Sequence, residues 1–260
     1  MIRSLWIAKT GMEAQQSALD AVSHNLANAS TNGYKRGHAV FEDLMYQNLR
    51  QVGADNAEGV QLPTGLQVGL GVRTVAMSRN FSQGGLQQTE NTLDLAINGQ
   101  GFFQIQMPDG TTGYTRDGAF QLNSTGQLVT SGGYAVLPGI TVPADADSIT
   151  VARDGTVRVK LPTQTETVEL GQIQTANFIN PAGLDPRGEN LYIESAASGG
   201  PQVGAPGTGN LGVLNQGMVE TSNVNVVTEL VTMIQTQRAY EMNSKAVSTS
   251  DQMLSRLGQL

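Results

Sequence analysis

Residues 2–28 read IRSLWIAKTGMEAQQSALDAVSHNLAN, and the periodicity of this stretch decides the fold. It contains no proline and a single glycine, so nothing in it ends a helix early. Apolar side chains recur seven residues apart, at Leu5, Met12, Leu19 and Leu26. A spacing of seven lines one side of a helix with a narrow apolar seam, as in a coiled coil. We therefore predict a long N-terminal helix whose seam faces a second helix.

A second stretch with the same period lies at the far end of the sequence. Asn225 is a good N-cap residue, Glu229 falls in the first turn, and no glycine or proline follows before Leu257. Its seam reads Val226, Met233, Tyr240, Val247 and Leu254. We predict that the two terminal helices pair through these seams as a coiled coil. The alternative is that both helices simply lie on the middle part of their own chain.

The middle of the sequence has short apolar runs separated by turn signals such as Pro108-Asp109-Gly110 and Arg153-Asp154-Gly155. Asp-Gly between such runs is typical of β-hairpins. We predict antiparallel strands at residues 102–107, 114–122, 127–130, 134–137, 149–152, 156–160, 168–178 and 191–194. Residues 47–84 show neither the helical nor the strand period, and we expect them to be extended or loop-like.

The predicted fold class is α+β, with an antiparallel all-β domain inserted between two paired terminal helices. We divide the sequence into an N-terminal helical segment at 1–46, an extended connecting segment at 47–84, an antiparallel β domain at 85–215 and a C-terminal helical segment at 216–260. The first eleven residues lack the apolar core and cleavage site of a secretory signal, and no run of about 18 apolar residues occurs. We expect neither a membrane span nor export by that signal.

The composition gives no sign of a catalytic, cofactor or metal site. A net charge of -7 argues against nucleic acid as a partner, and the absence of cysteine with only two histidines argues against a metal cage or a thiol nucleophile. Residues 207–212 match G-x-G-x-x-G, but they lie among glycines and prolines and are interpreted as a linker. Each candidate acid, Asp109, Asp117 and Asp154, precedes a glycine in a turn. We therefore interpret these aspartates as turn residues.

Both ends of the sequence resemble a known family. His24-Asn25-Leu26-Ala27-Asn28-Ala29-Ser30-Thr31-Asn32-Gly33-Tyr34-Lys35 is similar to the N-terminal signature of the bacterial flagellar rod and hook proteins, although the family often has Asn where this sequence has His24. The stretch that includes Gln237-Arg238-Ala239-Tyr240-Glu241 is similar to their C-terminal signature. The motif positions that we match to the family are Asn25, Leu26, Asn28, Thr31, Gly33, Tyr34, Lys35, Gln237, Arg238, Ala239 and Tyr240.

Two segments of the middle also resemble this family, namely 94–103 and Tyr114-Thr115-Arg116-Asp117-Gly118-Ala119-Phe120. The length excludes the longer hook members. The segment from Tyr46 to Arg73 is similar to the members that form the distal rod, with the proximal rod members as the closer alternative. A periplasmic wall hydrolase is the alternative from another class.

The resemblance implies a structural subunit without enzyme activity or cofactor, located in the rod of the basal body that spans the periplasm. It implies self-assembly into an open helical polymer, with the terminal helices packed around a narrow channel. The further partners that it implies are the proximal rod proteins, the hook protein, the peptidoglycan and outer-membrane ring proteins, and the flagellar type III export apparatus.

Overall fold

The computed structural model describes residues 2–50, 55–57, 60–61, 64–162 and 166–257. The chain forms two compact units, which we describe separately. The helical unit consists of Met1–Ala27, Gly37–Ser78 and Asn225–Leu260, and the β unit consists of Asn28–Arg36 and Arg79–Val224. The β unit thus extends beyond residues 85–215, because it also takes in the segment that follows the first helix.

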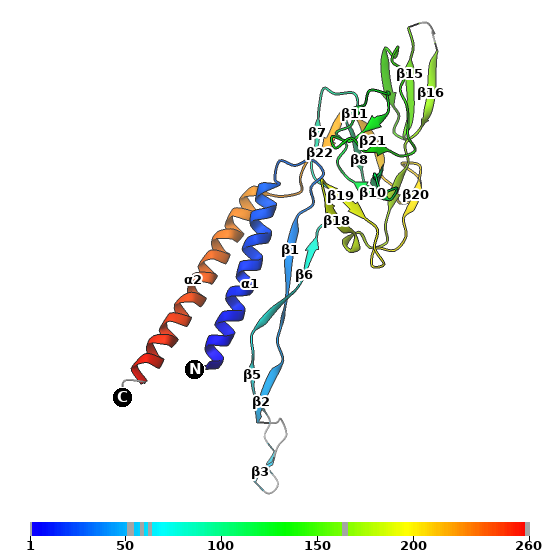
Figure 1. Cartoon of the computed structure of the whole chain (residues 1–260). Helices are drawn as coiled ribbons and strands as arrows, with labels where there is room; N and C mark the ends of the chain where they lie inside the picture. The colour runs from blue at the N-terminus through cyan, green and yellow to red at the C-terminus, as the bar shows by residue number, and fades with distance from the viewer. Residues whose placement is uncertain (1, 51–54, 58–59, 62–63, 163–165, 258–260) are drawn as a thin grey trace. The chain divides into compact units, whose positions relative to one another are not determined.

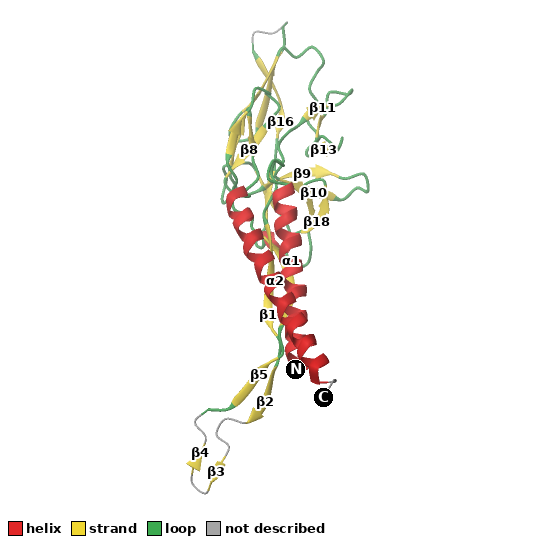
Figure 2. Cartoon of the chain, turned by 90° about the vertical axis from the view of Figure 1, so that its left-hand side faces the viewer, coloured by secondary structure: helices red, strands yellow, loops and turns green. Residues whose placement is uncertain are grey.

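The helical unit contains the two predicted helices, α1 (Ile2–Ala27) and α2 (Val226–Leu257), which lie side by side (Figures 1 and 2). Their pairing confirms the α+β prediction with paired terminal helices. Asn225 caps α2 as expected, since its side-chain oxygen accepts the Thr228 amide at 3.2 Å. No helix in the described part of the chain is long and apolar enough to cross a membrane.

A two-stranded ribbon completes the helical unit (Figure 1). β1 (Gly37–Asp43) pairs with β6 (Val72–Arg79), β2 (Tyr46–Arg50) with β5 (Leu66–Gly69), and β3 (Asp55–Ala57) with β4 (Val60–Gln61). The described part of the connecting segment expected from the sequence is therefore largely strand, and residues 51–54, 58–59 and 62–63 of it lie outside the described residues. Every side chain of β2 is exposed, so this strand has no buried face to impose the alternation of apolar and polar residues that indicates a strand.

The β unit is built on a nine-stranded sheet. Its main path runs β11 (Gln121–Leu122), β12 (Leu128–Val129), β13 (Ala135–Val136), β9 (Phe102–Gln106), β10 (Thr112–Thr115), β19 (Leu191–Ile193), β18 (Asp185–Gly188). β17 (Thr175–Asn177) pairs with β9 and with β20 (Gln202–Gly204). The short 3₁₀ helix η1 spans Pro181–Gly183. All strand pairs of this sheet are antiparallel, as predicted.

Three smaller sheets complete the unit. β14 (Ser148–Val151), β15 (Thr156–Lys160) and β16 (Thr167–Gln172) form one antiparallel sheet. β7 (Leu86–Gln88) pairs with β22 (Met218–Glu220), and β8 (Leu95–Asn98) with β21 (Val213–Gln216). The sequence pattern missed these last four strands, because each is at most four residues long and pairs with a partner more than a hundred residues away.

Strand β9 divides the core of the β unit between its two faces. Phe103 and Ile105 belong to the larger apolar cluster, while Phe102 lies on the other face with Tyr114 and Phe178. The strand predicted at 114–122 is not continuous, because β10 ends at Thr115, β11 begins at Gln121, and only an isolated bridge of Ala119 to Asp94 lies between them. A Cβ atom at Gly118 would lie only 1.6 Å from the Leu95 carbonyl oxygen, so the chain can make this approach only with glycine.

Candidate functional site

The buried side of α2 is polar. Glu229, Thr236 and Ser250 are its buried residues, and with Asn243 they follow one another at intervals of seven. A Cβ atom on Gly11 of α1 would lie 3.0 Å from the side-chain nitrogen Nδ2 of Asn243, so α1 and α2 approach closely there. The Thr236 hydroxyl donates to the Thr232 carbonyl at 2.8 Å, which satisfies it within the helix. Polar residues thus occupy a row of α2 that a coiled coil usually fills with apolar ones.

The apolar residues at the start of α2 lie on its opposite side. Each residue turns a helix by about 100°, so Val227, Leu230, Val231 and Ile234 share an arc of about 100°. Glu229 and Thr236 fall on the far side of that arc. All four apolar side chains are exposed, Val227 by 71%. This part of α2 therefore has its apolar side outward, the reverse of a helix that packs only within its own chain.

The predicted seam residues are covered only in part. Two of the seam residues, Val226 and Tyr240, are exposed. The others are half-buried, namely Leu5, Met12, Leu19, Leu26, Met233, Val247 and Leu254. The α1–α2 pair of a single chain therefore leaves apolar seam surface open. The role of the seam residues in assembly stays a prediction.

Asn25 of the N-terminal motif joins three parts of the helical unit. Its side-chain nitrogen donates to the Gly37 carbonyl at 2.7 Å and to the Glu229 carboxylate at 3.1 Å, and its oxygen accepts the Gly37 amide at 2.9 Å. Both Asn25 and Glu229 are 1% exposed. This side chain therefore links the end of α1 with the start of β1 and the first turn of α2, which explains why the motif places asparagine there.

The other motif residues differ in their surroundings. Gly33, Tyr34 and Lys35 are buried in the β unit, and the Thr31 hydroxyl donates to the half-buried Asn28 side chain at 3.1 Å. Gly33 has φ 67°, and a Cβ atom there would lie 2.6 Å from the Arg116 backbone. On α2, Gln237, Arg238 and Tyr240 are exposed and Ala239 is half-buried.

Lys35 ends the N-terminal motif inside a buried charged network of the β unit. Its Nζ lies 2.6 Å from Glu220 Oε1, and Nη1 of Arg116 lies 3.2 Å from Glu220 Oε2. The Lys35 and Glu220 side chains are 0% exposed, and the Arg116 side chain is 4% exposed. Two cations thus share one carboxylate away from water.

Backbone groups complete this network. Lys35 Nζ donates to the Ser82 carbonyl at 2.8 Å, Arg116 Nη2 donates to the Gly99 carbonyl at 2.6 Å, and the Gly84 amide donates to Glu220 at 2.8 Å. Burial lowers the pKa of Lys35, against the opposing attraction of Glu220. The three charged side chains are almost fully buried, so we interpret the network as structural.

Hydrogen bonds of Asn223 continue the network along the chain. Its side chain donates to the Asn80 carbonyl at 2.8 Å and accepts the Arg36 amide at 2.7 Å. The Gly33 amide also donates to the Glu220 carbonyl at 2.7 Å. These hydrogen bonds join three segments within the β unit, namely 28–36, 80–84 and 220–223.

The candidate acids act as turn residues, as predicted. Oxygens of Asp109, Asp117 and Asp154 accept backbone amides two residues further on, at 3.1, 3.1 and 3.0 Å. Residues 207–212 form turns and lead into β21 rather than a helix, so they lack the setting of a dinucleotide site. Among the residues that the structure describes, no group of three His, Asp or Glu side chains is placed to hold a metal ion.

The sequence placed Glu229 in the first turn of a helix without showing that it is buried, and it did not single out Glu220 or Arg116. Arg116 occurs inside a stretch that resembles the family, but nothing in its spacing or in that of Glu220 indicates burial. A charged residue is usually exposed, so only its partners, which lie far away in the sequence, reveal its place.

Comparisons with known proteins agree with this arrangement. The family described as "Flagella basal body rod protein" matches residues 5–35, the "Flagellar hook protein FlgE/F/G D1 domain" matches 96–159, and the "Flagellar basal body rod FlgEFG protein C-terminal" region matches 215–260. These matches cover both paired helices and part of the β unit.

Curated relatives match along the whole sequence. The flagellar basal-body rod protein FlgG of Buchnera aphidicola from Acyrthosiphon pisum is 56% identical over 260 residues, which is 100% of both chains. FlgG of Borreliella burgdorferi is 49% identical, covering 98% of this chain and 97% of its own. FlgG of Bacillus subtilis is 39% identical, covering 99% and 98%. The chain therefore belongs to the family of flagellar basal-body rod proteins, the structural subunits of the basal-body rod.

Proposed function

We propose that this chain is a subunit of the distal rod of the bacterial flagellum, which polymerises into a rigid helical tube and transmits motor torque to the hook. The observation that carries the proposal is the reversed polarity of α2. The buried residues of α2 are polar, whereas its apolar residues Val227, Leu230, Val231 and Ile234 are exposed. We infer that the terminal helices of neighbouring copies cover this outward face.

Such contacts suit an open polymer. The outward face of α2 and the seam residues of α1 are different surfaces, so a contact between them is heterologous. A heterologous contact that does not close into a ring generates a helical filament. Apolar surface left open in the free subunit then supplies the driving force for assembly.

The partners follow from this place in the flagellum. We propose contacts with further copies of the chain, with proximal rod proteins below and with the hook protein above. The peptidoglycan and outer-membrane ring proteins would surround the tube, and the flagellar type III apparatus would export the subunit. A proximal rod subunit stays the closest alternative.

The ribbon of the helical unit supports the distal position. It exposes Met45 by 83%, and Tyr46, Leu49 and Leu66 by half or more. A two-stranded ribbon has no core of its own and is marginal in isolation. We propose that residues 47–73 act as a lever that lies along neighbouring subunits and stiffens the rod. Deleting them should give a more flexible rod in electron micrographs, and unchanged stiffness would favour the proximal alternative.

A pair of neighbouring substitutions tests the assembly surface. Ile234→Asp places a charge on the outward apolar face, whereas Gln235→Asp places the same charge on the adjacent exposed polar residue. We expect the Ile234→Asp protein to stay monomeric in sedimentation and to fail to restore motility, because a buried unpaired charge costs several kcal/mol. Gln235→Asp should assemble normally. Assembly of both proteins would refute the proposed surface.

Two further variants test the seams. Leu19→Asp and Met233→Asp should block polymerisation while the β unit stays folded.

Basal bodies from cells that lack the gene should carry a short rod without a hook. An intact rod and hook in those cells would refute the proposed function.

A further inference from the structure

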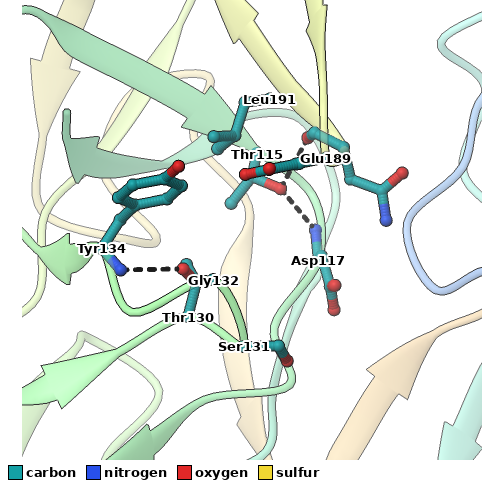
Figure 3. A pocket seen from close by; sticks show the side chains of 9 residues that line it. Thr115, Asp117, Thr130, Ser131, Gly132, Tyr134, Glu189 and Leu191 are labelled. Carbon is teal, nitrogen blue, oxygen red and sulfur yellow. Dashed lines mark hydrogen bonds between the residues drawn. The ribbon is translucent and has the colours of Figure 1, made fainter. Parts of the chain in front are cut away.

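A pocket of about 320 Å³, lined mainly by residues with polar side chains, opens in the β unit and takes no part in the assembly surfaces described above (Figure 3). Three separate stretches build it. Thr115 ends β10 and Asp117 follows it, Thr130 and Tyr134 flank the turn between β12 and β13, and Glu189 and Asn190 form the turn between β18 and β19. Its volume is at the lower end of the range for small-ligand pockets.

The charge of the pocket is unbalanced. Two of its nine described lining residues, Asp117 and Glu189, are acidic, and none is basic. The neighbouring Arg116 points its guanidinium at Glu220 in the buried network, so it does not neutralise Asp117. Burial raises the pKa of Asp117, as expected for a carboxyl group without a cation beside it. A ligand that brings a positive charge would correct this imbalance.

The walls of the pocket suit a flat cation. Tyr134 and Glu189 face the same space from different turns (Figure 3). A hydrogen bond from the Tyr134 hydroxyl to the Glu189 carboxylate raises the pKa of the tyrosine. A guanidinium group can stack on an aromatic ring while its N–H groups donate to a carboxylate.

The turn that supplies Glu189 is unusual in its backbone. Glu189 and Asn190 have φ values of 52° and 60°, the left-handed conformation that two-residue hairpin turns require. Asn-Gly adopts this conformation readily, whereas glutamate does so with strain. The strained residue is the one that places a carboxylate in the pocket, which is the kind of position where strain accompanies function.

We propose that this pocket binds a single guanidinium group, held between the Tyr134 ring and the carboxylates of Glu189 and Asp117. The group could belong to an arginine side chain of a second copy of the chain or to a free guanidinium compound. Binding to the free subunit does not depend on the proposed role in the rod, so each proposal can fail without the other.

Calorimetric titration of the full chain with argininamide tests the proposal. Citrullinamide is the matched control, because it has nearly the same shape without the charge. We expect argininamide to bind and citrullinamide to bind at least about tenfold more weakly, as for the loss of a charge-assisted hydrogen bond. Equal binding of the two compounds, or binding of neither, would overturn the proposal.

Substitutions locate the site. Glu189→Gln should weaken argininamide binding by about tenfold or more, and Asp117→Asn should weaken it in the same direction. Asp109→Asn removes a turn aspartate outside the pocket and should leave binding unchanged. Since Asp117 is half-buried, circular dichroism must show that its variant is folded, and the exposed Glu189 gives the decisive result. Wild-type affinity in Glu189→Gln would overturn the proposal.

Polymerisation distinguishes the two sources of the guanidinium group. If it belongs to a second copy, saturating argininamide and the Glu189→Gln substitution should both slow assembly of the chain. If it belongs to a free compound, binding should be seen in the titration while the assembly rate stays the same.

Discussion

Glu220 is a single carboxylate that holds two buried cations and a backbone amide. The three charged residues come from stretches far apart in the sequence. Lys35 ends the N-terminal motif, Arg116 follows β10, and Glu220 lies before α2. The desolvation of such a group is repaid only while all its partners are present. The contribution of Glu220 to the free energy of unfolding is thus best measured by replacing one charged residue at a time.

We predict that Glu220→Gln lowers the free energy of unfolding of the β unit by about 3 kcal/mol, because it leaves Lys35 and Arg116 buried without a counter-charge. Lys35→Met should cost less, since it leaves one cation for one carboxylate. Urea unfolding measures both. Glu169→Gln is the control, because its pair with Arg158 is exposed and spans 3.9 Å; its effect should stay below about 1 kcal/mol. An equal effect of Glu220→Gln and Glu169→Gln would contradict this account.

The raised pKa of Asp117 predicts a pH dependence of stability. A raised carboxyl pKa contributes stability below its unfolded value near 3.8, and this contribution is lost as the pH rises through the folded pKa. The unfolding free energy of Asp117→Asn minus that of the wild type should therefore increase as the pH rises above about 3.8 and then level off.

Asp154→Asn provides a control of opposite sign. The Thr156 backbone amide lowers the pKa of Asp154, so the wild-type residue contributes stability above pH 3.8 that is lost as the pH falls. The corresponding difference should decrease as the pH rises toward 3.8. Urea unfolding at several pH values measures both series, and parallel curves would contradict the assignment.

Single residues are the scale at which the sequence predicted least. Gly33 and Lys35 could be identified through the family signature, but their contacts with Arg116 and Glu220 could not, because these partners lie far along the chain. The seam residues show the same limit. Periodicity found the apolar row of α2, yet it could not show that the adjacent polar row, with Glu229 and Thr236, is the buried one.

At the scale of elements, the sequence predicted the helices well and the ribbon poorly. The period of seven and the N-cap at Asn225 gave α1 and α2 to within about a residue at each end. Strand β15 agrees with its predicted bounds, because Val157 and Val159 alternate with exposed residues. The ribbon strands β2 and β5 lack such alternation, since neither of their faces is buried.

The cap of α2 gives a prediction at this scale. Asn225→Ala should shift the start of α2 toward the unfolded state by about 1 kcal/mol, because the Thr228 amide loses its acceptor. We expect a weaker helical signal in circular dichroism of the monomer. Asn225→Ser keeps an acceptor and should leave the signal almost unchanged. An equal loss in both variants would show that the hydrogen bond does not stabilise the helix.

For the whole molecule, the distribution of apolar clusters separates the two units. Both clusters of buried apolar residues identified in the described chain belong to the β unit. The helical unit instead combines a buried polar row on α2 with exposed apolar side chains on α2 and on the ribbon. Stability should therefore be uneven, with the β unit stable in the free subunit and the helical unit dependent on its neighbours.

Hydrogen exchange of the monomer and the polymer tests this difference. Isolated helices are marginal in water, so amides of α1 and α2 in the monomer should exchange much faster than those of β9 and β10. Assembly should protect the helices strongly and change β9 little. The Ile234→Asp protein should keep the monomer pattern at concentrations where the wild type assembles. Helices as well protected as β9 in the monomer would show instead that the helical unit folds without neighbours, and that assembly joins preformed helices.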